Sequence, residues 1–188
     1  MIFEAINYLA EEMNEYFRSK LKVNEDKVII SALVNQDGTI AIQGENKLVI
    51  TLVNLEREIN GFGHTPATSG GQSFNRSSPA TINLHLMFSA YFSNINYTEA
   101  LRFLSFVVAY FQSNPVFGRS NAAGLDPRIE KLTMEMVTLS TEQVNNIWSM
   151  LGAKYMPSVI YKMRMLIFDD SIVREVRPVI SGVAQQTT

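Results

Sequence analysis

The sequence predicts an α+β fold in which a single mixed β-sheet has helices packed on it. Segments in which apolar residues alternate, as along a strand, are separated by segments in which they recur every three or four residues, as along a helix. A hydrophobic content of 46% is enough for a packed core. The length of 188 residues fits one domain with short extensions. The expected order is α-β-β-β-loop-β-α-β-α-β, followed by an extended tail.

The first element is an amphipathic helix over residues 2–21. Its apolar stripe consists of Ile2, Ile6, Leu9, Met13 and Phe17. Acidic residues lie near its start and basic residues near its end, an arrangement that the helix dipole favours. Its polar face is mainly acidic, whereas a helix that lies on a membrane surface carries basic residues there. We therefore expect this helix to dock on the core.

Three strands are expected next, over residues 27–34, 39–42 and 47–55. The first two are joined by Asn-Gln-Asp-Gly at 35–38, which contains residues that tolerate positive φ. The third is apolar on both sides. Leu48, Ile50 and Leu52 are expected on one face, and Val49, Val53 and Leu55 on the other. This pattern predicts a strand that is covered on both faces.

A long strand over residues 80–92 and a helix from residue 97 to 111 or 112 follow. One face of the strand is fully apolar. Asn96 and Glu99 have the spacing of a capping box at the start of the helix. The apolar surface of this helix is wide, because Leu101, Leu104 and Val108 are flanked by further apolar positions. That breadth suggests burial on more than one side.

The remaining elements are an irregular segment over residues 115–127, a strand over 130–139, a short helix and a last strand over 157–168. Ser140 and Gln143 form a second capping box, and Gly152 suits the C-terminal end of the short helix. The single tryptophan, Trp148, lies on the apolar stripe of this helix. Core packing is the simpler interpretation, and an interface anchor is the alternative.

Two segments break these patterns. Residues 59–79 contain four glycines and two prolines, which argues against helix or strand. A loop of this length is uncommon in a compact domain and is often functional or disordered. A mobile projection is one interpretation, with Phe62 and Phe74 as anchors, and an insertion with no role is the alternative. Residues 169–188 read as an extended tail. The predicted organisation is therefore a domain over residues 1–168 with a long loop at 59–79, and a C-terminal tail at 169–188.

The sequence contains no recognisable catalytic, cofactor or metal site. Cysteine is absent, and the two histidines, His64 and His85, lack a ligand spacing. His85 is interpreted as a partly buried, hydrogen-bonded strand residue. Gly61 and Gly63 start a pattern like a phosphate loop, but the rest of that motif is missing. We therefore predict a protein that is not an enzyme and that needs no cofactor.

Charge also limits the possible partners. The net charge is −2, which gives no electrostatic reason to expect nucleic-acid binding. No apolar stretch is long enough to span a bilayer, and the first residues lack the features of a secretory signal. Residues 1–60 carry a net charge of −4 and residues 61–188 a net charge of +2. Ordinary solvated faces are the simpler explanation, and subunits that dock head to tail are the alternative.

Several blocks of the sequence resemble one known family. They are residues 82–92 (INLHLMFSAYF), 97–104 (YTEALRFL), 107–117 (VVAYFQSNPVF) and, most specific, 139–166 (LSTEQVNNIWSMLGAKYMPSVIYKMRML). These blocks are similar to the N-terminal domain of the cap, or tail terminator, proteins of extracellular contractile injection systems, which are phage tail-like particles. The likeness covers nearly the whole chain and is strongest from about residue 80 to 168.

The resemblance implies a structural protein that forms a homohexameric ring at the end of the inner tube and sheath. The ring would stop their polymerisation and join the two, with extended segments engaging the sheath by strand addition. It also implies synthesis in the bacterial cytoplasm and assembly into a particle that is released or anchored to a membrane, without direct membrane insertion. A non-enzymatic adaptor or ligand-binding domain is the alternative.

We expect the loop at 59–79 or the C-terminal tail to contact a neighbouring subunit. The tail alternates partly, as an added strand would, although Pro178 removes one backbone donor. The candidate partner contacts are Phe62, His64, Phe74, Arg76, Val173, Arg174, Val176, Arg177 and Val179.

Overall fold

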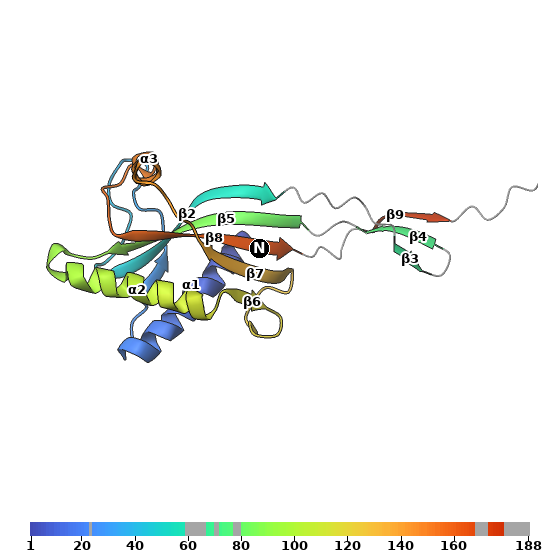
Figure 1. Cartoon of the computed structure of the whole chain (residues 1–188), viewed down its shortest axis with the longest axis horizontal. Helices are drawn as coiled ribbons and strands as arrows, with labels where there is room; N and C mark the ends of the chain where they lie inside the picture. The colour runs from blue at the N-terminus through green and yellow to red at the C-terminus, as the bar shows by residue number, and fades with distance from the viewer. Residues whose placement is uncertain (23, 59–66, 70–71, 77–79, 168–172, 179–188) are drawn as a thin grey trace, which may run out of the picture.

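The computed structural model describes residues 1–22, 24–58, 67–69, 72–76, 80–167 and 173–178, and it has the expected α+β architecture (Figure 1). A large mixed sheet has the strand order β1-β2-β5-β8-β7-β6. Its strands are β1 (Val28–Ile30), β2 (Lys47–Glu58), β5 (Ala80–Tyr91), β6 (Val116–Gly118), β7 (Ile129–Met136) and β8 (Ser158–Ile167). The helices are α1 (Ile2–Leu21), α2 (Tyr97–Ser113) and α3 (Thr141–Leu151), with a 3-10 turn, η1 (Asn94–Asn96), before α2. A small sheet consists of β3 (Ala67–Ser69), β4 (Gln72–Arg76) and β9 (Val173–Pro178).

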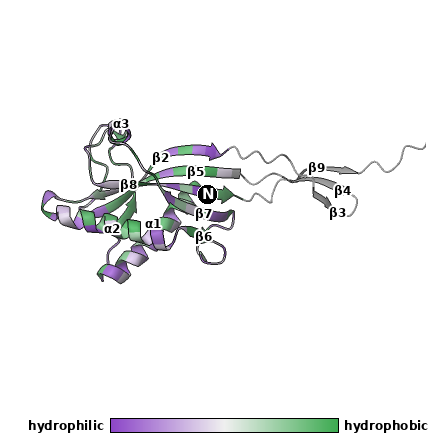
Figure 2. Cartoon of the chain, in the orientation of Figure 1, coloured by the Kyte–Doolittle hydropathy of each residue, from purple (hydrophilic) through white to green (hydrophobic). Residues whose placement is uncertain are grey.

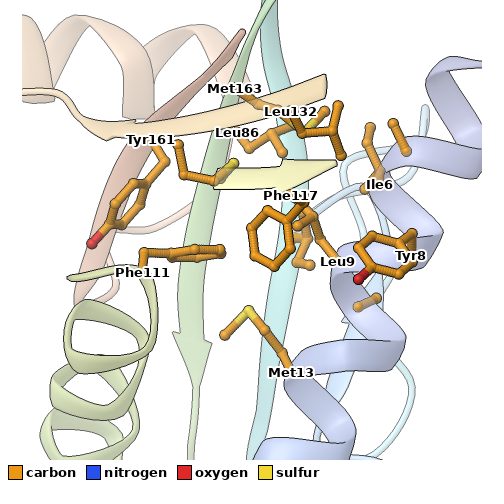
Figure 3. Packing of buried hydrophobic residues seen from close by; sticks show 14 of the residues in the cluster. Ile6, Tyr8, Leu9, Met13, Leu86, Phe111, Phe117, Leu132, Tyr161 and Met163 are labelled. Carbon is orange, nitrogen blue, oxygen red and sulfur yellow. The ribbon is translucent and has the colours of Figure 1, made fainter. Parts of the chain in front are cut away.

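One face of the large sheet, the α1–α2 face, holds the main hydrophobic core. The predicted stripe of α1 packs there, and Leu9, Met13 and Phe17 are almost completely buried. Figure 2 shows hydrophobic residues along the strands that these helices cover. Figure 3 shows Phe117 of β6 lying between Phe111 of α2 and Tyr8 of α1. Phe117 packs edge-to-face with Tyr8 of α1 and stacks with Tyr110 of α2, so the edge strand β6 is fixed through both helices.

The opposite face, the α3 face, carries a second and smaller core. Its buried members are Leu33, Ile42, Val49, Met87, Trp148 and Ile160. The capping box that the sequence predicts at α3 is confirmed, because Ser140 Oγ accepts from the Gln143 backbone N–H at 3.2 Å and Gln143 Oε1 accepts from the Ser140 backbone N–H at 2.9 Å. Gly152 ends the helix with φ 66°, a conformation that favours glycine.

A buried asparagine joins α1 to the edge strand β1. Asn14 Oδ1 accepts hydrogen bonds from the backbone N–H groups of Lys27 and Val28, both at 2.8 Å, and its Nδ2 donates to the Val28 carbonyl at 2.9 Å. These backbone groups point away from β2, where an edge strand has no ladder partner. Asn14 therefore satisfies the free side of β1.

The strands predicted at 27–34 and 39–42 are largely wrong. Strand β1 ends at Ile30 and pairs in parallel with β2, and only an isolated bridge joins Val34 to Ile40. The physical reason is that Leu33 and Ile42 turn into the core of the α3 face. Residues 31–42 therefore cover the sheet rather than extend it. Sequence patterns also missed the short strand β6 within the segment that was expected to be irregular.

Strand β2 is longer than predicted and contains a register shift between Leu52 and Asn54. Its first half is covered on both faces, as expected. Beyond the shift, Leu55 pairs with Leu84 while Leu52 pairs with Leu86, so both leucines of β2 lie on the α1–α2 face. The prediction of opposite faces for Leu52 and Leu55 is wrong because an extra residue in a bulge inverts the alternation.

Two predictions for α2 also need correction. The helix begins at Tyr97 as expected, but Asn96 makes no side-chain capping hydrogen bond, and its backbone (φ −102°, ψ 22°) lacks the extended conformation typical of an N-cap. Its Nδ2 donates to Asn46 Oδ1 at 3.2 Å. The wide apolar surface does not reflect burial on several sides. Phe103, Val107 and Phe111 are buried, whereas Leu101 is 45% exposed.

The prediction of a loop over 59–79 is wrong for part of that segment. Strands β3 and β4 form an antiparallel pair within it, and only Gly70 and Gly71 separate them in the sequence. Tight two-residue hairpin connections favour glycine. The predicted tail contributes β9, which pairs with β4. Since β3 follows β2, β4 precedes β5 and β9 follows β8, the order β3-β4-β9 repeats the order β2-β5-β8 of the large sheet.

Candidate assembly surfaces

The small sheet brings together six of the nine predicted partner contacts. Phe74 pairs with Val176, and Arg76 pairs with Val173. Arg174 and Arg177 also lie on β9. The other three candidates, Phe62, His64 and Val179, lie outside the described residues. Loop and tail were expected to act separately, and the small sheet joins them into one element.

The small sheet has free edges. Strand β4 is central, so β3 and β9 each have one side without a ladder partner among the described strands. Such an edge presents backbone N–H and C=O groups that an added strand can pair with. In Figure 1 the small sheet lies beyond the end of the large sheet at which β2 ends and β5 begins, away from α3.

Two ion pairs tie the large sheet together near that end. Arg164 of β8 forms a bidentate pair with Glu58 of β2, with distances of 2.6 Å (Nε to Oε2) and 2.9 Å (Nη2 to Oε1). This pair spans the intervening strand β5. Lys162 of β8 lies 3.3 Å from Glu135 of β7. The contacts lie on the part of the α3 face that α3 does not cover. There, ion pairs between strands take the place of helix packing against the sheet.

His85 completes this row and gives no indication of catalysis. Its Nε2 lies 3.4 Å from Glu56 Oε2 without hydrogen-bond geometry, and the atom is buried without another partner. The expectation that His85 is partly buried is confirmed, and the expectation that it is hydrogen-bonded is wrong. No group of three potential metal ligands occurs among the described residues. In the same part of the chain, no helix has the length and hydropathy needed to cross a membrane.

Burial and a neighbouring acid perturb two tyrosines beside α1. Burial is the main factor that raises the pKa of Tyr8 and of Tyr110, and the negative charge of Glu12 raises both further. The Tyr110 hydroxyl donates to Glu12 Oε2 at 3.4 Å. Both rings pack in the α1–α2 core, so we interpret this as a structural contact.

Trp148 is a core residue, as the simpler interpretation predicted. It is 5% exposed and packs edge-on against Tyr155 at a centroid distance of 5.6 Å. Other large apolar residues are exposed. Ile95 is 94% exposed and Phe3 is 67% exposed. Sequence reasoning missed their exposure because folded proteins leave some apolar residues on the surface, and the residue type alone does not show which ones.

Comparison with known proteins decides the family. The family model for the Pvc16 N-terminal domain matches residues 4–182, nearly the whole chain. The chain belongs to the Pvc16 N-terminal domain family. This result confirms the resemblance that the sequence blocks indicated. No match was found among curated protein sequences.

Two solved structures share the fold. One is described as the sheath/tube terminator of an extracellular contractile injection system, PVC, in the extended state; it has a TM-score of 0.63 and 15% sequence identity. The other is the tube terminating cap of the anti-feeding prophage, with a TM-score of 0.58 and 16% identity. The alignments cover 100% and 93% of this chain, respectively. They cover only 64% and 58% of those two chains, so both known proteins extend beyond the shared domain.

Proposed function

We propose that this protein is a structural cap, or tail terminator, of a contractile injection system, which ends the inner tube and sheath and joins the two. The observation that carries the proposal is family membership over residues 4–182. The fold shared with a sheath/tube terminator and a tube terminating cap supports it. The role is structural and non-catalytic, and the working form is a ring of six copies within an assembled injection particle.

The proposed contacts divide between the two parts of the chain. The domain over residues 1–168 contacts the last ring of the inner tube, and the small sheet contacts the sheath. Strand β9 is already paired with β4, so the tail acts as part of a sheet that accepts a further strand. The candidate contacts on this sheet are Phe74, Arg76, Val173, Arg174, Val176 and Arg177.

The test is a matched pair of truncations. Deletion of residues 171–188 removes β9, whereas deletion of residues 179–188 keeps it. Particles would be assembled with tube and sheath proteins plus each cap variant and imaged by electron microscopy. We expect the longer deletion to leave a folded protein that no longer caps particle ends, and the shorter deletion to cap normally. Normal capping by the longer deletion would refute the role of β9, and absence of wild-type protein from tube ends would refute the cap itself.

A further inference from the structure

An apolar hollow opens on the α3 face at the end of the domain away from the small sheet. It measures about 360 Å³ and lies between residues 33–40, the end of β5 and the turn after α3. Its apolar lining includes Leu33, Val34, Ile40, Tyr91, Phe92 and Met156. Cavities of about 150 Å³ accept a benzene ring, so this space is large enough for an aromatic side chain.

The charged residue in the lining of the hollow is Lys154. It makes no ion pair with any side chain that the structure describes. A partner that fills the hollow would therefore present a large apolar side chain with acidic residues beside it.

Helix α1 presents such a surface. Phe3, in its first turn, is 67% exposed although it is a large aromatic residue. Asn7, Glu11 and Glu15 follow it at intervals of four residues, so they lie on the same side of the helix. Glu11 accepts a hydrogen bond from Asn7 Nδ2 at 2.7 Å, and neither Glu11 nor Glu15 has a cationic partner among the described side chains.

The two surfaces lie on opposite faces of the large sheet. Helix α1 packs in the core of the α1–α2 face, whereas Leu33 and Met156 of the hollow belong to the cluster of the α3 face. One chain cannot bring Phe3 to its own hollow, but a second copy can. Contacts between unlike surfaces continue from copy to copy and generate rings when the rotation closes.

We infer that Phe3 of one copy fills the hollow of the next copy, with Glu11 and Glu15 directed toward Lys154. This inference rests on the proposed ring, and it identifies the two surfaces through which neighbouring copies would contact each other.

The test uses one variant for each surface. Phe3→Asp disrupts the apolar side chain, and the double variant Ile40→Asp with Lys154→Glu disrupts the hollow. Met150→Asp is the matched control, because Met150 is 63% exposed on α3 outside both surfaces. Circular dichroism establishes that each variant is folded, and sedimentation analysis measures self-association. We expect the wild type and the control to associate, and each surface variant alone to associate roughly tenfold or more weakly.

Mixing the two defective variants gives the decisive measurement. Each retains the surface that the other lacks, so a head-to-tail contact predicts one-to-one dimers in the mixture and monomers in the separate samples. A mixture that stays monomeric, or variants that associate like the wild type, would overturn the inference but leave the ring intact. A wild type that is monomeric alone and forms rings only on tube ends would also overturn it. A wild type that forms no ring under either condition would refute the proposed ring itself.

Discussion

Replacement of Asn14 by alanine should destabilise the protein more than most single substitutions. Asn14 makes three hydrogen bonds to backbone groups of residues 27 and 28, and it is 8% exposed. Each buried hydrogen bond contributes about 0.5–1.5 kcal/mol net. The alanine variant also leaves the free side of β1 without partners. We therefore expect the free energy of unfolding to fall by about 3 kcal/mol, which corresponds to a Tm decrease of roughly 6–12 °C in a domain of this size.

Urea unfolding followed by the fluorescence of Trp148 measures this change. The control is Asn7→Ala, because Asn7 bonds only to the exposed Glu11 of the same helix. We expect that control to change the free energy of unfolding by about 0.5 kcal/mol or less. A loss below about 1 kcal/mol for Asn14→Ala, with an unchanged m-value, would show that the edge strand does not depend on this side chain.

Three further changes test other parts of the fold. Ser140→Ala removes the N-cap of α3 and should lower the free energy of unfolding by about 1 kcal/mol in thermal or urea unfolding; no loss would mean that the cap is dispensable. Arg164→Met should speed amide hydrogen exchange at the end of β2, where Glu58 loses its partner, and should change global stability by less than about 1 kcal/mol; unchanged exchange there would contradict this. The raised pKa of Tyr110 stabilises the fold fully below pH ~10, and this contribution is lost as pH rises toward the folded-state pKa. Absorbance titration of tyrosinate should therefore show late ionisation that Tyr110→Phe reduces, whereas ionisation of all tyrosines near pH ~10 in the folded protein would contradict it.

Periodicity predicted the elements that depend on a single apolar face. The stripe of α1, the long strand β5 and the capped helix α3 all follow from local residue spacing, and each is confirmed. Predictions failed where a distant contact decides the local structure. Strand β1 ends at Ile30 because Leu33 turns into a core built mainly by residues more than 50 positions away. The bulge in β2 left no signal, because Leu55 is apolar on either face.

The candidate surfaces were predictable only in part. Glycines at 70–71 are as typical of a mobile loop as of a hairpin connection, and the choice depends on pairing between β4 and β9, about 100 residues apart in the sequence. The exposure of Phe3 and Ile95 was not predictable, because the residue type alone does not indicate whether the folded chain buries it. The family blocks were informative because they combine many positions, whereas no single residue in them identifies a function.

A force applied to the small sheet along its strands would act in shear. Antiparallel ladder bonds run perpendicular to the strands, so such a pull strains many of them at once instead of opening them one after another. The load also enters the large sheet through three neighbouring strands, because β3, β4 and β9 connect in sequence to β2, β5 and β8. The β5 strand is flanked on both sides by long ladders, and the pair between Glu58 and Arg164 joins the two outer strands across it. This geometry suits an element that must transmit tension without unfolding.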